Sequence, residues 1–189
     1  MKVHLCCGAT YLTGYLNCDI VGENALLHPT PNDNETTVEK YFKIPFEMDA
    51  TKRIRKPFII DHQMNILEKW PFLDHSIDEI ITVSTWEHFE HKDELPHLIQ
   101  EAYRCLKPGA VWKFDFPDIK KVVELYHDDN MEFCAEQIYC NHKNKYSVHQ
   151  WGYSPKTIPL YLTPDKWDLD FKDVVKHDYP MTGCWAVKK

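Results

Sequence analysis

Two short apolar runs near the start of the chain, separated by a glycine turn, constrain the fold most strongly. Val3-His4-Leu5-Cys6 is closed by Cys7-Gly8, and eleven positions after Gly8 the run Tyr15-Leu16-Asn17-Cys18 ends at Asp19. A glycine lets the backbone approach a ligand closely, because it carries no side chain. An acid at the tip of the second strand of an α/β sheet can accept hydrogen bonds from both ribose hydroxyls. The order of strand, glycine, strand and acid therefore predicts a nucleoside pocket.

Strand-like and helix-like segments alternate in the middle of the chain. Residues Ile77–Ser84 and Val111–Phe116 are β-rich and apolar, as buried strands are. Between them, Asp93 can cap a helix that ends at Lys107-Pro108-Gly109. Its apolar residues share one helical face: Leu95, Leu98, Ile99, Ala102 and Leu106. Such alternation is typical of a mostly parallel sheet with right-handed crossovers.

The remaining elements complete one α/β domain over residues 1–189. Pro57–Ile60 is predicted as a strand, Asp118 as the cap of a helix carrying Ile119, Val122, Val123 and Tyr126, and Thr157–Leu162 as weakly helical. The polar, His- and Asn-rich stretch from Asp129 to His149 gives no element. Two strands close the sheet at Phe171–His177 and Gly183–Val187, the final strand antiparallel. Because parallel strands present their carboxyl ends at one edge, we expect Gly8, Asp19, Ser84 and Asp118 there.

A long loop insertion is predicted at residues 22–56. Turn-forming residues cluster in Leu27–Glu35, which includes Pro29 and Pro31. Within the insertion, Val38–Phe42 is compatible with a short helix. The basic run Lys52–Lys56 is interpreted as a solvated surface turn.

Composition excludes several classes of partner. Lys+Arg 22 against Asp+Glu 29 gives a net charge of −7, which disfavours bulk nucleic-acid binding. Seven cysteines without a Cys-x-x-Cys pair indicate a reducing compartment. Met1-Lys2 is followed too soon by His4 and Gly8 for a signal peptide, and no apolar run approaches the ~18 residues of a membrane span. We therefore expect a cytoplasmic protein without a membrane partner.

Three segments together resemble a class I S-adenosyl-L-methionine-dependent methyltransferase of the small stand-alone, methyltransferase type 11-like kind. They are Leu5–Ile20, Trp70–Phe89 and Glu101–Asp118, with a softer fourth match at His149–Ser154. Order and spacing agree as well as residue type, over about half of the chain. The resemblance implies a Rossmann-like three-layer sandwich, S-adenosyl-L-methionine as cofactor, and methyl transfer to a small-molecule or glycan acceptor.

The resemblance also implies roles for individual residues around the cofactor. Asp19 would hold the ribose hydroxyls and Asn65 with Ile66 would frame the adenine. The methionine portion would be lined by Cys6, Cys7, Gly8, Ser84 and Thr85. Two positions depart from the family pattern. Cys6 stands where the family usually has its first glycine, so its side chain would crowd the cofactor, and Asn65 stands where many members have an acid.

Glu87-His88 is the predicted catalytic pair, because histidine can act as a general base near neutral pH. His149 is predicted to face the acceptor. The alternative is that Glu87-His88 only fixes the loop after the strand. No metal site is expected: Glu87–His91 matches neither His-Glu-x-x-His nor His-x-x-Glu-His. The set Cys134, Cys140, His142 and His149 fits no familiar zinc spacing.

Two other functions stay open at this point. A non-catalytic relative that kept the fold as a binding module is favoured by Cys6. An oxidoreductase that binds a dinucleotide is disfavoured, because the next glycine after Gly8 is Gly14 and the Gly-x-Gly-x-x-Gly fingerprint is missing.

Overall fold

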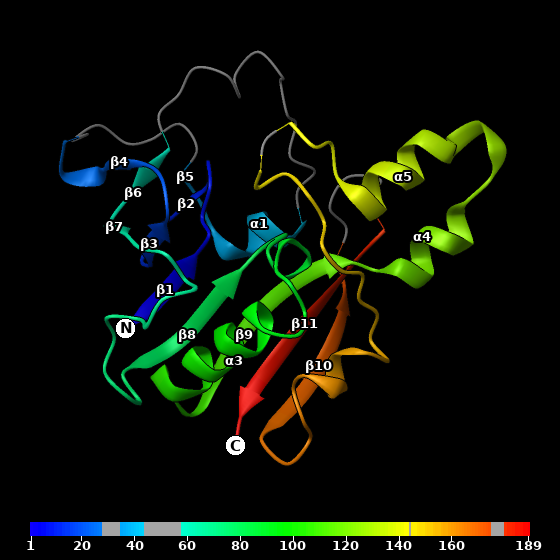
Figure 1. Ribbon diagram of the computed structural model, residues 1–189. Helices are drawn as coiled ribbons and strands as arrows, with labels where there is room; N and C mark the ends of the chain where they lie inside the picture. The colour runs from blue at the N-terminus through cyan, green and yellow to red at the C-terminus, as the bar shows by residue number, and fades with distance from the viewer. Residues whose placement is uncertain (28–34, 44–57, 144, 175–179) are drawn as a thin grey trace.

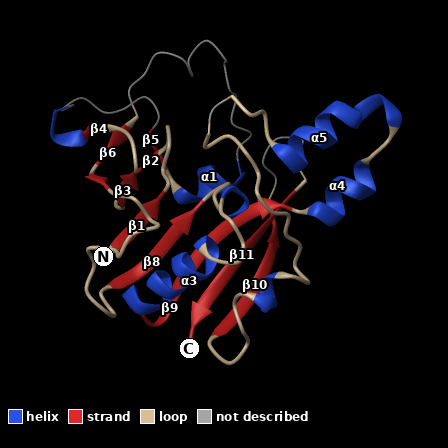
Figure 2. Ribbon diagram, viewed as in Figure 1, coloured by secondary structure: helices blue, strands red, loops and turns tan. Residues whose placement is uncertain are grey.

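The computed structural model describes residues 1–27, 35–43, 58–143, 145–174 and 180–189, and it is built around a seven-stranded sheet (Figures 1 and 2). Neighbouring strands run parallel from β7 to β9, whereas β11 is antiparallel to both β9 and β10. The predicted mostly parallel sheet with a final antiparallel strand is confirmed. The order across the sheet is β10 (Trp167–Asp173), β11 (Met181–Lys188), β9 (Leu106–Pro117), β8 (Ile77–Thr82), β1 (Lys2–Leu5), β3 (Leu16–Asp19) and β7 (His62–Gln63).

Helices cover the two faces of the sheet. Successive side chains of a strand point to opposite faces, and Ile80 and Ile81 of β8 accordingly join different apolar clusters. The larger cluster, which we call the main core, includes α3 (Glu94–Cys105), seen in front of the sheet in Figure 1. The smaller cluster includes Tyr41 and Phe42 of α1 (Val38–Lys43). The result is the expected three-layer, Rossmann-like sandwich.

Helix α3 confirms the predicted apolar face and corrects its cap. Its buried residues include Leu95, Leu98, Ala102 and Cys105, and Ile99 is packed against the main core. The helix ends before Lys107-Pro108-Gly109, as predicted, since Leu106 is already extended. Asp93 occupies the N-cap position, but its side chain makes no capping hydrogen bond. The backbone carbonyl of Glu90 accepts from the Leu95 N–H in the first turn at 2.9 Å, while its carboxylate accepts from the N–H groups of Lys92 and Asp93 in the turn before the helix, both at 2.8 Å.

A buried carboxylate ties α3 to the segment before β8. Glu101 is 7% exposed and accepts from the Trp70 backbone N–H at 2.7 Å. It also accepts from Nε and Nη2 of Arg104 at 2.9 and 2.6 Å. Arg104 in turn donates from Nη1 to the carbonyl of Phe72 at 2.8 Å. Because charged hydrogen bonds are stronger than neutral ones, this pair fixes the course of the chain into β8.

Replacing Glu101 with glutamine should lower the free energy of unfolding by about 2 kcal/mol, because a charge-assisted pair is lost beside a partly buried guanidinium. The hydrogen bond from Arg104 holds the pKa of Glu101 below its usual value. The contribution is therefore present above the unfolded pKa and is lost as the pH falls through the folded pKa. Urea unfolding at pH 7 and below pH 4 checks this. Glu124→Gln is the control, because Glu124 forms an exposed ion pair with Lys120. It should lower the free energy of unfolding by under about 0.5 kcal/mol.

Two helices form an arm beside the carboxyl end of β9 (Figure 1). Asp118 caps α4 (Ile119–Leu125) as predicted, accepting from the Lys120 N–H at 3.1 Å. Of the apolar residues expected on this helix, Val122 is buried, Val123 is 65% exposed, and Tyr126 lies just after the helix. The following 3-10 helix η3 (Asp128–Asn130) and α5 (Met131–Tyr139) lie in a stretch where no element was expected. That stretch is polar because only one narrow side of α5 is buried, at Cys134 and Gln137.

Short elements surround the predicted insertion. The expected strand at Pro57–Ile60 is present as β6 (Ile59–Ile60), but it pairs with β4 (Glu23–Asn24) outside the main sheet. Helix α1 confirms the short helix predicted at Val38–Phe42. The basic run Lys52–Lys56 and residues 28–34 lie outside the described residues. The remaining short elements are β2 (Tyr11–Leu12) paired with β5 (Glu35–Thr36), and the 3-10 helices η1 (Ala25–Leu27), η2 (Trp86–His88) and η4 (Ile158–Leu160).

The last two strands differ slightly from their predicted bounds. β10 begins at Trp167, earlier than expected, because its alternating burial starts there, and it ends at Asp173. η4 confirms the helical tendency of Thr157–Leu162. Within the described part of the chain, no helix has the length and apolar character that crossing a membrane requires.

Candidate functional site

The glycine turn after β1 meets the acid at the end of β3. The two strands pair in parallel with Leu5 opposite Cys18, so their carboxyl ends coincide. Asp19 accepts from the backbone N–H of Gly8 through Oδ2 at 2.9 Å and from that of Ile20 through Oδ1 at 2.7 Å. The predicted unit of strand, glycine, strand and acid is thus assembled by direct hydrogen bonds.

The turn leaves open space beside Gly8. Gly8 has a φ of +53°, and no described atom beyond its two neighbours in the chain lies within 4 Å of the place where a Cβ would stand. Each carboxylate oxygen of Asp19 has two lone pairs. Oδ2 uses one lone pair to accept from the Gly8 N–H, and Oδ1 uses one to accept from the Ile20 N–H. The Val21 N–H lies farther from Oδ1, at 3.4 Å. Both oxygens can therefore accept a further hydrogen bond, as two ribose hydroxyls require.

Cys6 adopts a left-handed backbone conformation that glycine normally occupies. Its φ is +52°, in the left-handed region where a side chain costs about 1–2 kcal/mol. The Cys6 side chain is partly buried and packs against the main core. Burial, and then the nearby Asp19 carboxylate, raise the pKa of its thiol, so it stays protonated. Cys7 is buried, and its N–H donates to the carbonyl of Cys18 at 3.1 Å.

The residues predicted to frame adenine follow β7. The Met64 N–H donates to the carbonyl of Asp19 at 2.9 Å, which places this turn beside the end of β3. Asn65 is half-buried, and its side-chain oxygen accepts from the Leu67 N–H at 3.1 Å. Ile66 is buried in the main core, and its carbonyl accepts from the Trp70 indole at 3.0 Å. Their adenine contacts stay predictions, and the structure leaves Asn65 the more accessible of the two.

A strained turn exposes Ser84 at the end of β8. Ser84 has a φ of +47°, and its N–H donates to Oδ1 of Asp115 at 2.7 Å. Asp115 is fully buried in β9, and no role was predicted for it. The available signal was an acidic residue in a strand whose other charged residues, Lys107 and Lys113, are basic. Thr85, also predicted at the cofactor, is buried and donates to the carbonyl of Val83 at 3.0 Å.

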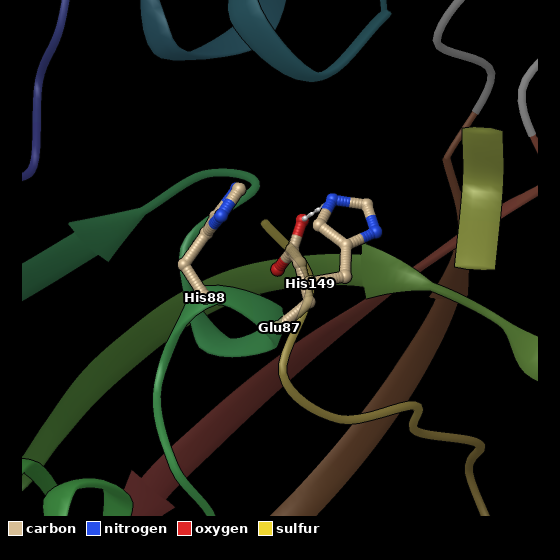
Figure 3. Close-up of side chains that lie close together, drawn as sticks. All are labelled: Glu87, His88 and His149. Carbon is tan, nitrogen blue, oxygen red and sulfur yellow. Dashed lines mark ion pairs between the residues drawn. The ribbon is translucent and has the colours of Figure 1, made fainter. Parts of the chain in front are cut away.

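The three predicted catalytic residues come together (Figure 3). The Gln150 N–H donates to the carbonyl of Glu87 at 2.6 Å, which brings the segment after α5 against η2. His149 Nε2 lies 4.0 Å from Oε1 of Glu87, and the rings of His88 and His149 are 4.9 Å apart, edge to face. Two segments far apart in the sequence thus contribute to one cluster, which we call the Glu–His–His cluster.

Backbone contacts fix the tautomer of both neutral imidazoles. His88 Nδ1 lies 3.0 Å from the carbonyl of Val148, and His149 Nδ1 lies 2.9 Å from that of Gln137. A carbonyl can only accept, so Nδ1 carries the hydrogen and the neutral ring keeps its lone pair on Nε2. Burial lowers the pKa of both histidines, and the carboxylate of Glu87 partly opposes this at His149. Glu87 itself is 2% exposed.

A cavity of about 220 Å³ adjoins this cluster at the carboxyl end of β9. Its walls come from η2, from the end of β9, from α4 and α5, and from the segment after α5. The residues that line it are Glu87, Pro117, Ile119, Val122, Gln137, Ile138, His149, Trp151 and Gly152. The wall on α5 was missed because that helix was not predicted. Cys134, Cys140, His142 and His149 were considered together from the sequence. Among the described residues, they do not come close enough together to bind one metal ion.

The chain is similar to known methyltransferases in sequence pattern and in fold. Residues 7–112 match the family model described as "Methyltransferase domain", more than half of the 189-residue chain. A SAM-dependent methyltransferase from Methanosarcina mazei matches with a TM-score of 0.60 and 15% identity, over 100% of this chain and 91% of that one. One from Aquifex aeolicus matches with a TM-score of 0.50 and 13% identity, over 100% and 81%.

Other comparisons are less extensive. The chain spans 44% of a protein from Bordetella parapertussis, with a TM-score of 0.51, 11% identity and 69% of this chain covered. At these identities, likeness to solved structures shows the fold. A search of curated proteins gives no match. The family match, over a segment that holds the glycine turn, Asp19 and Glu87-His88, shows that the chain belongs to the methyltransferase domain family.

Proposed function

We propose that this enzyme methylates a small-molecule acceptor held in the cavity beside Glu87 and His149. The observation that carries the proposal is that the cavity opens on the Glu–His–His cluster. Both lie at the carboxyl ends of the strands, the edge that also holds Gly8 and Asp19. Ligands of open α/β sheets bind at this edge.

The chain's own groups suit the cofactor at this edge. Asp19 would accept from the ribose hydroxyls, and Gly8 would allow close approach along the backbone. Ser84, exposed by its left-handed turn, would flank the methionine portion next to β1, since β1 and β8 are neighbours. S-adenosylmethionine supplies a methyl group activated on a sulfonium sulfur.

The Glu–His–His cluster would handle the acceptor's proton. Nε2 of His149 carries a lone pair on the cavity wall, where it can take a proton from a hydroxyl or amine. His88 and the Glu87 carboxylate would hold that imidazole in place. Much of the acceleration would come from positioning, because the cavity fixes the acceptor relative to the cofactor.

The cavity size favours a small acceptor. Its volume of about 220 Å³ is below the ~300–1,000 Å³ of most drug-sized ligand sites. Glycan methylation would therefore involve a single terminal sugar. At the rim, Trp151 stacks on His91 with ring centroids 3.6 Å apart and offers a flat surface to a ring-shaped acceptor.

Filling the cavity should impair acceptor use without affecting the cofactor. We expect Ile138→Trp to raise the acceptor KM at least about tenfold, because the larger side chain occupies the α5 wall of the cavity. The acceptor is found by measuring S-adenosylhomocysteine release with a panel of small phenols, hydroxy acids, amines and sugars. Leu125→Trp, at an exposed position on α4, is the control. Equal losses of acceptor and cofactor affinity would argue against the cavity as the acceptor site.

Cys6→Gly should tighten S-adenosylhomocysteine binding by about two- to tenfold, because glycine adopts the left-handed turn without a Cβ near the ligand. Calorimetry checks it, with Cys6→Ala as the control that removes sulfur but keeps Cβ. Binding in the glycine variant and none in the native protein would instead favour the non-catalytic binding module. Unchanged or weaker binding in Cys6→Gly would remove the crowding hypothesis.

A further inference from the structure

We infer that Glu87, His88 and His149 bind one divalent transition-metal ion at the wall of the acceptor cavity. Metal binding by these residues does not depend on the proposed function. The role assigned to the ion below does rest on it.

The three side chains already converge. One ligand atom from each, a ring nitrogen of His88 and of His149 and a carboxylate oxygen of Glu87, lies within 4.8 Å of the other two. In Figure 3 the Glu87 carboxylate stands between the two imidazole rings. A tetrahedral ion with ligand bonds of about 2.1 Å spaces its ligand atoms about 3.4 Å apart. Small side-chain rotations would close the remaining gap.

The surroundings of both histidines are those of metal ligands. A ligating histidine usually donates its second ring N–H to a backbone carbonyl or a carboxylate, which fixes the tautomer and the ring orientation. His88 does so to Val148 at 3.0 Å and His149 to Gln137 at 2.9 Å. Each ring is therefore held with Nε2, the atom that can ligate, available in the deprotonated form.

Charge and donor type narrow the choice of ion. Two neutral imidazoles and one carboxylate carry a net charge of −1, so a divalent ion leaves the site with +1. Imidazole suits zinc, copper, iron and nickel, whereas magnesium and calcium prefer oxygen ligands. The side chains of Glu87 and His149 are only 2% and 10% exposed. A cation would stabilise the buried carboxylate that the fold places there.

Three protein ligands leave a coordination position open, as in catalytic sites. Because Glu87 and His149 line the cavity, that position would face the acceptor. With the ion bound, the lone pair on Nε2 of His149 is a metal ligand, so the ion would replace the imidazole base: it would bind an acceptor hydroxyl and lower its pKa, and the proton would pass to water. The oxygen then forms its bond to the methyl carbon, the carbon–sulfur bond breaks, and its electron pair stays on sulfur. The preferred acceptors would be phenols or enols, which form a stabilised oxyanion.

The sequence expectation of no metal site rested on local spacing. Glu87 and His88 are adjacent and match no zinc motif within one helix. The third ligand comes from the segment after α5, and the contact between Glu87 and Gln150 that brings it close is visible only in the fold.

Cobalt binding tests the site directly. The chelator-treated protein, without cofactor or acceptor, is titrated with Co²⁺, and binding is detected by visible absorption. A second titration with Zn²⁺ is measured by calorimetry. We expect one ion per chain, with at least about 100-fold weaker binding in His149→Ala and Glu87→Gln. His91→Ala, a neighbouring histidine outside the cluster, should bind like the native protein. Circular dichroism and thermal unfolding, measured in each variant, show that it remains folded.

The outcomes separate this inference from the proposed function. No binding up to millimolar Co²⁺ and Zn²⁺, or equal weakening by His91→Ala and His149→Ala, would overturn the metal site. Asp19→Ala should bind Co²⁺ normally. Loss of cobalt binding in that variant, with the fold intact by circular dichroism, would also contradict the assigned ligands. Stoichiometric Co²⁺ binding that depends on His149 supports the site even if no acceptor is methylated, a result that would count against the proposed function alone.

Discussion

Asp19→Ala should weaken S-adenosylhomocysteine binding by about 1.5–3 kcal/mol, or roughly 10- to 150-fold, since hydrogen bonds from both ribose hydroxyls to a carboxylate are lost. The change also releases the N–H groups of Gly8 and Ile20, which the carboxylate holds at 2.9 and 2.7 Å. The turn that lines the pocket is therefore loosened at the same time. Calorimetric titration of both proteins measures the difference.

A second acid at a strand end provides the control. Asp118 follows β9, caps α4 and accepts from the Thr182 hydroxyl at 2.9 Å. Asp118→Ala should cost about 1 kcal/mol of stability through the lost cap and leave S-adenosylhomocysteine affinity unchanged. If Asp19→Ala bound as tightly as the native protein, Asp19 would be only a turn residue.

Trp86→Ala should lower the free energy of unfolding by about 3–5 kcal/mol, because it removes a fully buried indole from the main core. The ring is stacked on Phe114 with centroids 4.1 Å apart and meets Trp112 and Tyr153 at 5.0 and 5.9 Å. Trp86 begins η2, so its anchoring also holds Glu87 at the cavity. Chemical denaturation with fluorescence or circular dichroism detection measures the loss.

Trp86→Phe tests how much of this loss comes from the size of the indole and how much from losing an aromatic ring altogether. It keeps a ring against Phe114 and should cost roughly half as much as alanine, with a cavity left by the smaller ring. A loss below about 1 kcal/mol for Trp86→Ala would show that η2 is held by other contacts, such as the backbone hydrogen bond from Gln150 to Glu87.

Local pattern predicted the elements whose side chains meet the core regularly. Strand β8 is β-rich and buried over most of its length, helix α3 carries its apolar residues at the period of a helix, and the side chain of Asp118 caps α4. Helix α5 escaped prediction because few of its residues are buried. Most of a helix's stability comes from packing of its apolar face, so the residues of a helix that is buried on only one narrow side give a weak pattern in the sequence.

The site was predictable in composition and not in assembly. The glycine turn and Asp19 are close in sequence, so the parallel pairing of β1 and β3 brings them together. The meeting of Glu87 with His149 depends on a loop after α5, and the support of Ser84 by Asp115 depends on the β8–β9 register. The left-handed backbone of Cys6 is equally a property of the folded turn, since nothing in the residue itself favours it.

The most direct test of the cofactor site is calorimetric titration of S-adenosylhomocysteine into the native protein. The site formed by Gly8 and Asp19 predicts one ligand per chain with micromolar affinity, corresponding to about −8 kcal/mol. The absence of binding up to millimolar ligand would contradict a working cofactor site and would indicate a binding module that kept the methyltransferase fold.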